Sequence, residues 1–201
     1  MENIKTTLTK CIKKRIESKM GKLKVTKCDI EGLAIIEPEV HRDNRGYFVE
    51  TYNQKDMEEA GLNMTFVQDN QSMSTKGVLR GLHRQMEYPQ GKLVRVFRGE
   101  VFDVAVDLRE GSPTYGQWHG VILSEENMKQ YYIPEGFAHG FLVLSDEAEF
   151  TYKVTDFYHP GDELGIMWND PDIGVEWPIP DDMEIILSDK DKDLPFLKDI
   201  K

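Results

Sequence analysis

Histidine, lysine and arginine side chains gather around glycines in one segment of this sequence, in a pattern suited to acid–base chemistry. The segment GVLRGLHRQ places Arg80 and His83 on either side of Gly81, and Lys92 follows His83 by nine residues. A neutral imidazole is the natural proton acceptor near pH 7, and a neighbouring lysine is suited to stabilise an oxyanion. The pairing points to proton abstraction with a developing negative charge. A single histidine in a strand is more often structural, so the segment alone does not decide the matter.

The segment IPEGFAHGF adds a second histidine, His139, behind Pro134 and Gly136. This spacing is similar to the second conserved motif of the cupin barrels, many of which bind a metal through a His-x-His pair and a glutamate in their first motif. The corresponding stretch here, HRQMEYPQG, has Gln85 in place of the second histidine and offers Glu87 as a carboxylate. Because this ligand set is incomplete, we expect a pocket without metal. A site of two histidines and one carboxylate is the alternative.

The elements that must position these residues are short strands. Apolar or alternating runs such as GLAIIEPEV, YFVETY, KLVRVFRG and EFTYKVTDFY are separated by turn residues, at intervals of roughly 8–12 residues that are typical of a sandwich or barrel. Gly99-Glu100 is expected to form a tight hairpin, and NQKDMEEAG a short helix that ends at Gly61. The sequence therefore predicts a mainly β fold with a few short helices.

Alternation along the predicted strands separates a core face from a polar face. In EFTYKVTDFY one face is shared by Phe150, Tyr152, Val154, Asp156 and Tyr158. In KLVRVFRG one face is shared by Lys92, Val94, Val96 and Arg98. A third strand is expected to turn Phe102, Val104, Val106 and Leu108 towards a core, with Asp103, Asp107 and Arg109 on the other side. A small antiparallel barrel with an apolar end keeps room for a polar, ligand-sized pocket at its other end.

Composition excludes several classes of protein. The 201 residues include 25 basic and 36 acidic side chains, for a formal net charge of −11, so the chain lacks the basic face that nucleic-acid binding needs. Its two cysteines, Cys11 and Cys28, argue against a disulfide scaffold and fit a reducing compartment. No apolar run reaches the roughly 20 residues of a membrane span, and the first twenty residues lack the apolar core of a signal peptide. We expect a cytoplasmic protein with no nucleic-acid or membrane partner.

Residues 1–21 differ from the rest, because they are rich in lysine and repeat an apolar residue every four positions from Ile4 to Met20. This stripe predicts an amphipathic helix that docks on a partner surface or lies free, and a basic helix of this kind is also suited to an anionic membrane. We interpret the segment as an extension without chemistry of its own. The folded domain is expected to span residues 22–201.

Nine strings, in order from about Lys22 to Leu197, resemble the dTDP-4-dehydrorhamnose 3,5-epimerases, the RmlC-type sugar-nucleotide epimerases of the cupin superfamily. They are DNRGYFVETY, FVQDNQS, GVLRGLH, QGKLVRVFRGEVFDVAVDLR, SPTYGQW, IPEGFAHGF, TYKVTDFYHP, WNDPDIGVEWP and LSDKD. The resemblance implies a cupin-like antiparallel β-barrel (jelly roll) that works as a homodimer without cofactor or metal. It also implies epimerisation of a dTDP-4-keto-6-deoxy sugar at C3 and C5, on the route to dTDP-L-rhamnose.

The resemblance also implies a role for each candidate site residue. His83 matches the family's general base, and Asp191 the carboxylate paired with it. Lys92 matches the residue beside O4 of the sugar, and Tyr152 the proton donor on the opposite face. The other matches are the diphosphate-binding arginines and the lining of the nucleotide and sugar pocket: Arg45 and Arg80, then Glu50, Gln68, Asn70, His139, Tyr158 and Lys190. Without the resemblance, Lys190 and Asp191 would be interpreted as part of a solvated acidic tail.

Alternatives remain within and outside this family. The presence of both His83 and Tyr152 favours an epimerase over a 3,4-ketoisomerase, since inversion needs a base and an acid on opposite sides of the ring. It leaves open a 3- or 5-monoepimerase, or an epimerase acting on another nucleotide's 4-keto sugar. From other classes, a non-catalytic sugar-binding cupin and a metal-dependent dioxygenase are disfavoured by the presence of Lys92 and by the incomplete ligand set. The chain departs from the family at Arg84, where an aromatic residue is common, and in the residues before Lys22.

Overall fold

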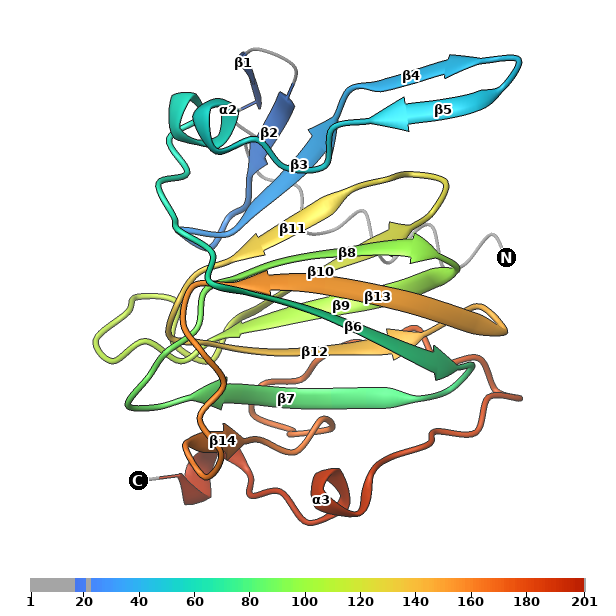
Figure 1. Cartoon of the computed structure of the whole chain (residues 1–201). Helices are drawn as coiled ribbons and strands as arrows, with labels where there is room; N and C mark the ends of the chain where they lie inside the picture. The colour runs from blue at the N-terminus through green and yellow to red at the C-terminus, as the bar shows by residue number, and fades with distance from the viewer. Residues whose placement is uncertain (1–16, 21–22, 201) are drawn as a thin grey trace.

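Two antiparallel β-sheets packed face to face form the body of the protein, so the predicted mainly β fold is confirmed (Figure 1). The computed structural model describes residues 17–20 and 23–200. Within these residues, one sheet has seven strands in the order β1-β2-β3-β11-β8-β13-β6, and the other has five in the order β10-β9-β12-β7-β14. The architecture is that of a jelly roll, with a separate two-stranded hairpin, β4–β5, attached at one end.

The strands are short, and helices are few. The seven-stranded sheet consists of β1 (Glu17–Met20), β2 (Leu23–Lys27), β3 (Ala34–Pro38), β11 (Gln130–Ile133), β8 (Lys92–Arg98), β13 (Glu147–Val154) and β6 (Gln68–Thr75). The five-stranded sheet consists of β10 (Trp118–Ser124), β9 (Glu100–Asp107), β12 (Phe137–Val143), β7 (Leu79–Gln85) and β14 (Glu163–Gly165). The remaining elements are β4 (Val40–Asp43), β5 (Gly46–Val49), the helices α2 (Gln54–Glu59) and α3 (Asp189–Lys192), and a 3-10 turn at Leu197–Asp199.

The main core lies between the two sheets. Val94 and Phe150 from the seven-stranded sheet meet Ala105 and Phe141 from the five-stranded sheet, and all four side chains are buried. A further cluster covers the outer face of the five-stranded sheet, where Phe102, Val104, Val106 and Leu108 pack against Ile166 and Ile173 of the C-terminal segment. Burial of both faces removes the apolar surface of both sheets from water, which is the main stabilising contribution to such a fold.

Strand β9 corrects one expectation about its faces. The apolar face from Phe102 to Leu108 does meet a core, but it is the outer one, made with the C-terminal segment. The opposite face points between the sheets and carries Val101, Asp103 and Ala105, all of them fully buried. Alternation revealed the two faces, but it carried no information about a distant segment that covers the second one.

The predicted turn at Gly99-Glu100 and the helix that ends at Gly61 are both confirmed. Gly99 joins β8 to β9 with a φ of 80°, a conformation that favours glycine. Asn53 caps α2 by accepting hydrogen bonds from the next backbone amides, and Gly61 follows the helix with a φ of 79°. The expectation for EFTYKVTDFY was wrong at its end, because β13 stops at Val154. Asp156 and Tyr158 therefore lie in the loop beyond the strand.

The N-terminal prediction is testable only in part. Residues 1–16 of the predicted helix lie outside the described residues. Residues 17–20 form strand β1, which pairs with β2 in the seven-stranded sheet, so the helix does not extend to Met20. No helix within the described part of the chain is long and apolar enough to cross a membrane.

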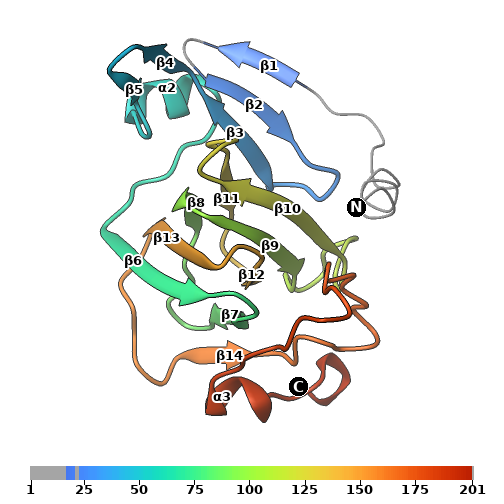
Figure 2. The same cartoon turned by 90° about the vertical axis from the view of Figure 1, so that its right-hand side faces the viewer.

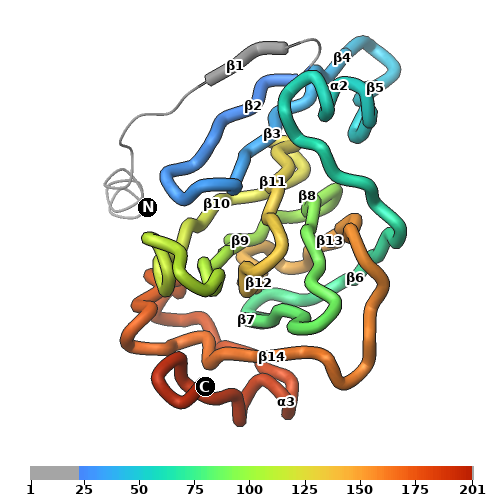
Figure 3. Tube along the Cα trace, turned by 90° about the vertical axis from the view of Figure 1, so that its left-hand side faces the viewer, coloured from blue at the N-terminus to red at the C-terminus, as the bar shows by residue number. Residues whose placement is uncertain are grey.

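The two ends of the molecule carry different elements. Hairpin β4–β5 and helix α2 lie at one end, whereas β14 and α3 lie at the other, beside β7 (Figures 2 and 3). The C-terminal segment reaches β7 through backbone hydrogen bonds from Leu79 N to Ile186 O and from Ile186 N to Gly77 O. This path brings α3 to the edge of the cavity described next.

Candidate active site

A cavity of about 550 Å³ opens between the two sheets and is closed on one side by the C-terminal segment. Its walls come from β7 and β12 of the five-stranded sheet, from β8 and β13 of the seven-stranded sheet, and from β14 and α3. Eight of the residues singled out in the sequence line it: Arg80, His83, Lys92, His139, Tyr152, Tyr158, Lys190 and Asp191. Residues that are more than a hundred positions apart in the chain thus share one site.

Two glycines allow β7 and β12 to approach closely beside His83. The strands pair His83 with His139, and their register shifts between His139 and Phe141. A Cβ on Gly81 would lie 2.5 Å from the Cα of Gly140, and Gly81 has a φ of 114°. Only glycine fits this contact, and a glycine within a strand often marks such a close backbone approach.

Carboxylate oxygens lie within hydrogen-bond distance of both ring nitrogens of His83. Its Nε2 lies 2.6 Å from Asp191 Oδ1, and its Nδ1 lies 3.1 Å from Glu163 Oε1. Asp191 is buried and is fixed by the Ser188 side chain, which caps α3 by accepting a hydrogen bond from the Asp191 backbone amide. Burial lowers the pKa of His83, although the charges of Glu163 and Asp191 oppose the shift. A neutral imidazole with one carboxylate fixing its tautomer is suited to accept a proton.

Glu163 reaches His83 because of the pairing between β14 and β7. Gly165 lies opposite His83 in this pairing, and Glu163, two residues earlier in β14, lies opposite Gln85. Side chains two residues apart in a strand share a face, so Glu163 projects on the side of His83. Its second oxygen, Oε2, accepts from the Lys190 ammonium at 2.8 Å. Glu163 therefore connects the histidine to a lysine at the cavity edge.

Lys92 projects from β8 into the cavity, where burial lowers its pKa to about 8. The negative charges of Glu163 and Asp103 oppose this shift. Asp103 is fully buried, with Oδ2 2.9 Å from His139 Nε2 and with Oδ1 lacking a hydrogen-bond partner in the described part of the chain. A lysine poised in this way remains a cation near neutral pH in a place of low dielectric, where its charge acts strongly on a nearby oxyanion.

Tyr152 faces the cavity from β13, in the sheet opposite His83. Burial raises its pKa above the ordinary value, Arg80 acts in the other direction, and Glu163 and Tyr158 add to the increase. The phenol is therefore protonated at neutral pH and available as an acid. Arg80 is held beside it through hydrogen bonds from Nε and Nη2 to Ser74 Oγ, at 3.1 and 3.0 Å.

Gln68 and Asn70 lie next to the cavity on β6, the edge strand of the seven-stranded sheet. Gln68 Nε2 donates to Asn70 Oδ1 at 2.8 Å, while Gln68 Oε1 accepts from the backbone amide of Tyr158 at 3.2 Å. Asn70 lines a second hollow of about 340 Å³ together with Tyr152 and Arg95. Since Tyr152 belongs to both hollows, they meet at this residue.

Arg45 and Glu50 do not reach either hollow. Arg45 lies at the tip of hairpin β4–β5, with its side chain 85% exposed and paired with Asp43 two residues away. Glu50 follows the hairpin and accepts a hydrogen bond from Asn53 Nδ2 at 2.9 Å. These two predicted site residues thus line neither hollow in this chain, although Thr51, which follows Glu50, lines the second one.

The stretch considered for a metal site is engaged in other contacts. Gln85, which stands where a second histidine ligand would be, donates to the carbonyls of Tyr88 and Phe157 and accepts from the His159 amide, so it links two loops. Glu87 is exposed and does not line the cavity. Among the described residues, no group of three His, Cys, Asp or Glu side chains is arranged to hold a metal ion.

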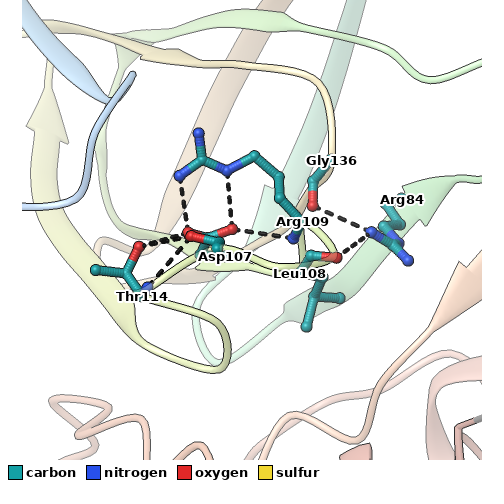
Figure 4. A network of polar contacts seen from close by, with 7 residues as sticks. Arg84, Asp107, Leu108, Arg109, Thr114 and Gly136 are labelled. Carbon is teal, nitrogen blue, oxygen red and sulfur yellow. Dashed lines mark hydrogen bonds and ion pairs between the residues drawn. The ribbon is translucent and has the colours of Figure 1, made fainter.

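Arg84, the departure from the family pattern, has a structural role here. Its Nη1 donates to the carbonyl oxygens of Leu108 and Gly136, at 2.7 and 3.2 Å, next to the cluster in which Asp107 accepts from Arg109 and Thr114 (Figure 4). The guanidinium thus ties β7 to two loops, and burial lowers its pKa. Its positive charge is directed towards these carbonyls.

Sequence reasoning missed Glu163 and Asp103 as site residues. Glu163 is one of 36 acidic residues and lies in a three-residue strand whose partner only the fold reveals. Asp103 was recognised as lying on the polar face of its strand, but its burial against His139 depends on the packing of the two sheets. The one signal available was a charged residue within an otherwise apolar strand, which often marks a functional position.

Comparison with known proteins places this site in a family. The sequence profile of dTDP-4-dehydrorhamnose 3,5-epimerase matches residues 27–199. This chain belongs to the dTDP-4-dehydrorhamnose 3,5-epimerase family. It is an epimerase, an isomerase by class, and the resemblance inferred from its motifs is confirmed.

Individual members of the family are similar over nearly the whole chain. The dTDP-4-dehydrorhamnose 3,5-epimerase of Methanothermobacter thermautotrophicus is 57% identical over 180 residues, which cover 90% of this chain and 97% of that protein. The crystal structure of the RmlC epimerase from Legionella pneumophila, in complex with dTDP-4-keto-L-rhamnose, superposes with a TM-score of 0.86 at 52% identity, covering 89% of this chain and 95% of that one. ChmJ, a 3'-monoepimerase from Streptomyces bikiniensis solved with dTDP-quinovose, has a TM-score of 0.78 at 38% identity, with 85% and 86% of the two chains covered.

Proposed function

We propose that this enzyme inverts C3 and C5 of dTDP-4-dehydro-6-deoxy-D-glucose to form dTDP-4-dehydro-L-rhamnose, in the synthesis of dTDP-L-rhamnose. The observation that carries the proposal is the position of His83 and Tyr152 on the two facing sheets, with one cavity between them. Inversion needs a proton to leave one face of the carbon and another to arrive at the opposite face. The enzyme's low cysteine content fits work in a reducing compartment, the cytoplasm.

In this mechanism His83 is the base. Both C3 and C5 are adjacent to the C4 ketone, which acidifies their protons, so no redox step is needed. Asp191 accepts a hydrogen bond from the N–H group at Nε2 and thereby fixes the tautomer in which Nδ1 keeps its lone pair. His83 takes the proton through Nδ1, and the electron pair of the C–H bond enters an enolate.

Lys92 and Tyr152 complete the step. The ammonium of Lys92 stabilises the negative charge on O4, in a buried position where such a charge interacts strongly. Tyr152 then donates its proton to the carbon from the other sheet. Because burial raises the pKa of this phenol, it is suited as an acid and unsuited as a base at neutral pH.

Residues at the edge of the cavity are proposed to bind the dTDP group. Arg80 offers a forked guanidinium to a diphosphate, and Lys190 adds a second cation at the edge of the site. Tyr158, 52% exposed, lies where an aromatic ring is available to a base. His139, Gln68 and Asn70 supply further polar groups at or beside the cavity.

A homodimer accounts for the residues that this chain leaves outside its own cavity. Arg45 matches a diphosphate-binding arginine of the family, yet it lies on an exposed hairpin with Tyr47 and Phe48 56% and 68% exposed beside it. A second copy of the chain would bring this hairpin, with Arg45 and Glu50, to its partner's cavity. An exposed hairpin carrying aromatic side chains is suited to such pairing.

The proposed function is tested by NMR of the reaction with dTDP-4-dehydro-6-deoxy-D-glucose in D₂O. We expect deuterium at both C3 and C5 and the L-rhamno product. Deuterium and inversion at C3 alone would indicate a 3-monoepimerase, the second candidate, which is favoured by the similarity to ChmJ.

The reaction is also expected to proceed without a metal. Its chemistry uses only proton transfers, and the Gln85 side chain is committed to loop carbonyls and an amide. Activity should be unchanged after exhaustive treatment with a chelator. A stoichiometric bound metal whose removal abolishes activity and whose return restores it would contradict this.

A further inference from the structure

The proposed roles of His83 and Tyr152 leave a proton imbalance after each inversion. When a C–H bond of the sugar breaks, its proton passes to His83 and its electron pair enters the enolate. The enolate carbon then forms a new C–H bond with the proton of the Tyr152 hydroxyl. The site is left with an imidazolium and a phenolate, so His83 must lose a proton and Tyr152 must gain one before the next carbon reacts.

Glu163 is positioned to take part in this exchange. Its Oε1 lies 3.1 Å from His83 Nδ1, and its Oε2 lies 2.8 Å from Lys190 Nζ. The side chain of Glu163 is 17% exposed, whereas that of Lys190 is 53% exposed. The contacts form a continuous chain from the buried base to the edge of the cavity.

The protonation state of His83 decides whether Nδ1 is able to donate a hydrogen bond to Glu163. A neutral imidazole carries one ring proton. This proton lies on Nε2, because Asp191, which is buried and 2.6 Å away, accepts a hydrogen bond from it. Nδ1 then has a lone pair, which gives Glu163 no proton to accept. Once Nδ1 has taken a proton from the sugar, it becomes a donor that faces a carboxylate within hydrogen-bond distance.

We propose that Glu163 is the proton relay that resets His83 and Tyr152 after each inversion. The N–H bond at Nδ1 of the imidazolium breaks and an O–H bond forms on Glu163. The resulting carboxylic acid then gives the proton to the Tyr152 phenolate, directly or through solvent in the cavity. His83 and Tyr152 are neutral again and Glu163 is again a carboxylate, so no further reactant is consumed. This inference rests on the proposed division of roles between His83 and Tyr152.

The position of Glu163 relative to the other reacting groups supports this assignment. Glu163 lines the same cavity as Tyr152 and Lys92. Its charge raises the pKa of both groups, which shows that the carboxylate lies within electrostatic reach of them. A single carboxylate thus interacts with the base, the acid and the cation of the proposed mechanism.

Lys190 holds the Glu163 carboxylate near His83 through an ion pair with Oε2. For a C–H bond of the sugar to reach Nδ1, the nearer oxygen of Glu163 must withdraw from it. The ion pair between Oε2 and Lys190 keeps the carboxylate close to His83 during this displacement, so it is able to return after the proton has moved. Lys190 acts on the reaction through Glu163 and is a positioning residue in this respect.

The test is the pre-steady-state behaviour of Glu163→Gln, which removes the proton-accepting group and keeps the size of the side chain. In rapid-quench experiments we expect a burst of one inversion per active site at a rate close to that of the unmodified enzyme. Later inversions should be at least tenfold slower, and KM should fall together with kcat, because the slow step then follows the chemical step. Added formate, a small carboxylate, should restore the slow phase in proportion to its concentration. Glu147→Gln is the matched control, since this carboxylate pairs with Arg98 at the far end of β13 and should behave as unmodified enzyme.

Three results would overturn the relay. If the burst and the later inversions are slowed equally, Glu163 only shapes the site, and if neither is slowed, it has no part in the proton path. Absence of rescue by formate counts against the relay in the same way. Glu163→Asp keeps a carboxylate and should retain turnover, which covers the case in which the glutamine variant does not fold. A failure of the proposed function is distinguishable, because it would appear as undiminished deuterium exchange in His83→Asn.

Discussion

The cavity and hairpin β4–β5 carry candidate site residues in opposite ways. In the cavity, Asp191 is buried and His83 lies within hydrogen-bond distance of two carboxylates that come from distant parts of the chain. On the hairpin, Arg45 has its side chain 85% exposed and pairs with Asp43, its near neighbour in sequence. The cavity residues thus have their partners within one chain, whereas Arg45 lines neither hollow of its own chain. This difference is the basis for proposing that the hairpin serves a second copy of the chain.

The two regions also differ in how strongly their side chains are held in place. A partly buried histidine exchanges hydration for a hydrogen bond to a buried carboxylate, so its geometry is strongly determined. An exposed arginine beside an aspartate is free to exchange that partner for a ligand with little loss, because surface ion pairs contribute little to stability. Substitutions in the cavity should therefore affect the chemical step, and substitutions in the hairpin should affect binding.

The largest effect is expected for His83→Asn. Without a base, both product formation and deuterium incorporation at C3 and C5 should fall by about 10²–10⁴-fold, the usual contribution of a general base. The measurement is NMR in D₂O, with circular dichroism to confirm that the variant is folded. Exchange at the unmodified rate would place the base elsewhere, and His139, which lines the same cavity, would be the next residue to test.

Tyr152→Phe should separate exchange from inversion. Proton removal by His83 can continue, and the proton can return to the original face from the same side. We expect deuterium to enter the substrate while inverted product falls by about 10²-fold or more, the loss of a general acid. Normal inversion of both carbons in this variant would mean that another group, with Tyr158 the nearest candidate, delivers the proton.

Arg45→Ala tests the hairpin side of the comparison. Loss of a charge-assisted contact to diphosphate should lower kcat/KM by about tenfold to hundredfold, mainly through KM. The melting temperature should be unchanged, because Arg45 contacts only Asp43 among the described side chains. A fall in kcat with unchanged KM would show that Arg45 acts on the chemical step instead.

Mixed dimers decide which chain the hairpin serves. In a dimer of one His83→Asn chain and one Arg45→Ala chain, hairpin exchange leaves one cavity with both His83 and Arg45 intact. Activity at low substrate should then approach half that of the unmodified dimer. If each hairpin serves its own chain, no intact site exists, and activity should be about half that of the Arg45→Ala dimer, because only one of its two cavities keeps His83.

The sequence was informative about the hairpin and the strands but not about the contacts across the cavity. Gly99-Glu100 indicated a tight hairpin, and NQKDMEEAG a short helix that ends at Gly61, because turns and helix ends depend on local chemistry. These features depend on residues that are neighbours in sequence.

The pairing of Glu163 with His83 had no such local signal. It follows from a three-residue strand joining β7, which alternation cannot reveal in so short a run. The role of Asp191 came from resemblance, since a carboxylate in an acidic tail is usually solvated. The structure gives the physical basis: Ser188 caps α3 and the bridge at Val78 and Ile186 carries the segment to β7. Long-range packing, not propensity, brings this carboxylate to the histidine.

The smallest expected effect is a pH dependence that arises in the cavity alone. With its pKa lowered to about 8, Lys92 is a cation below this pH and loses its charge above it. Since kcat/KM reports ionisation of the free enzyme, it should be level near pH 7 and fall by about tenfold per unit well above pH 8. Tyr152 does not account for this limb, because its pKa lies above the ordinary tyrosine value. Arg45→Ala should lower the whole profile without moving the limb, because Arg45 is proposed to contact the diphosphate, whereas Lys92 is proposed to face O4 of the sugar. A limb that moves with the hairpin substitution, or that is absent up to pH 9.5 or so, would show that the charge of Lys92 does not limit the reaction.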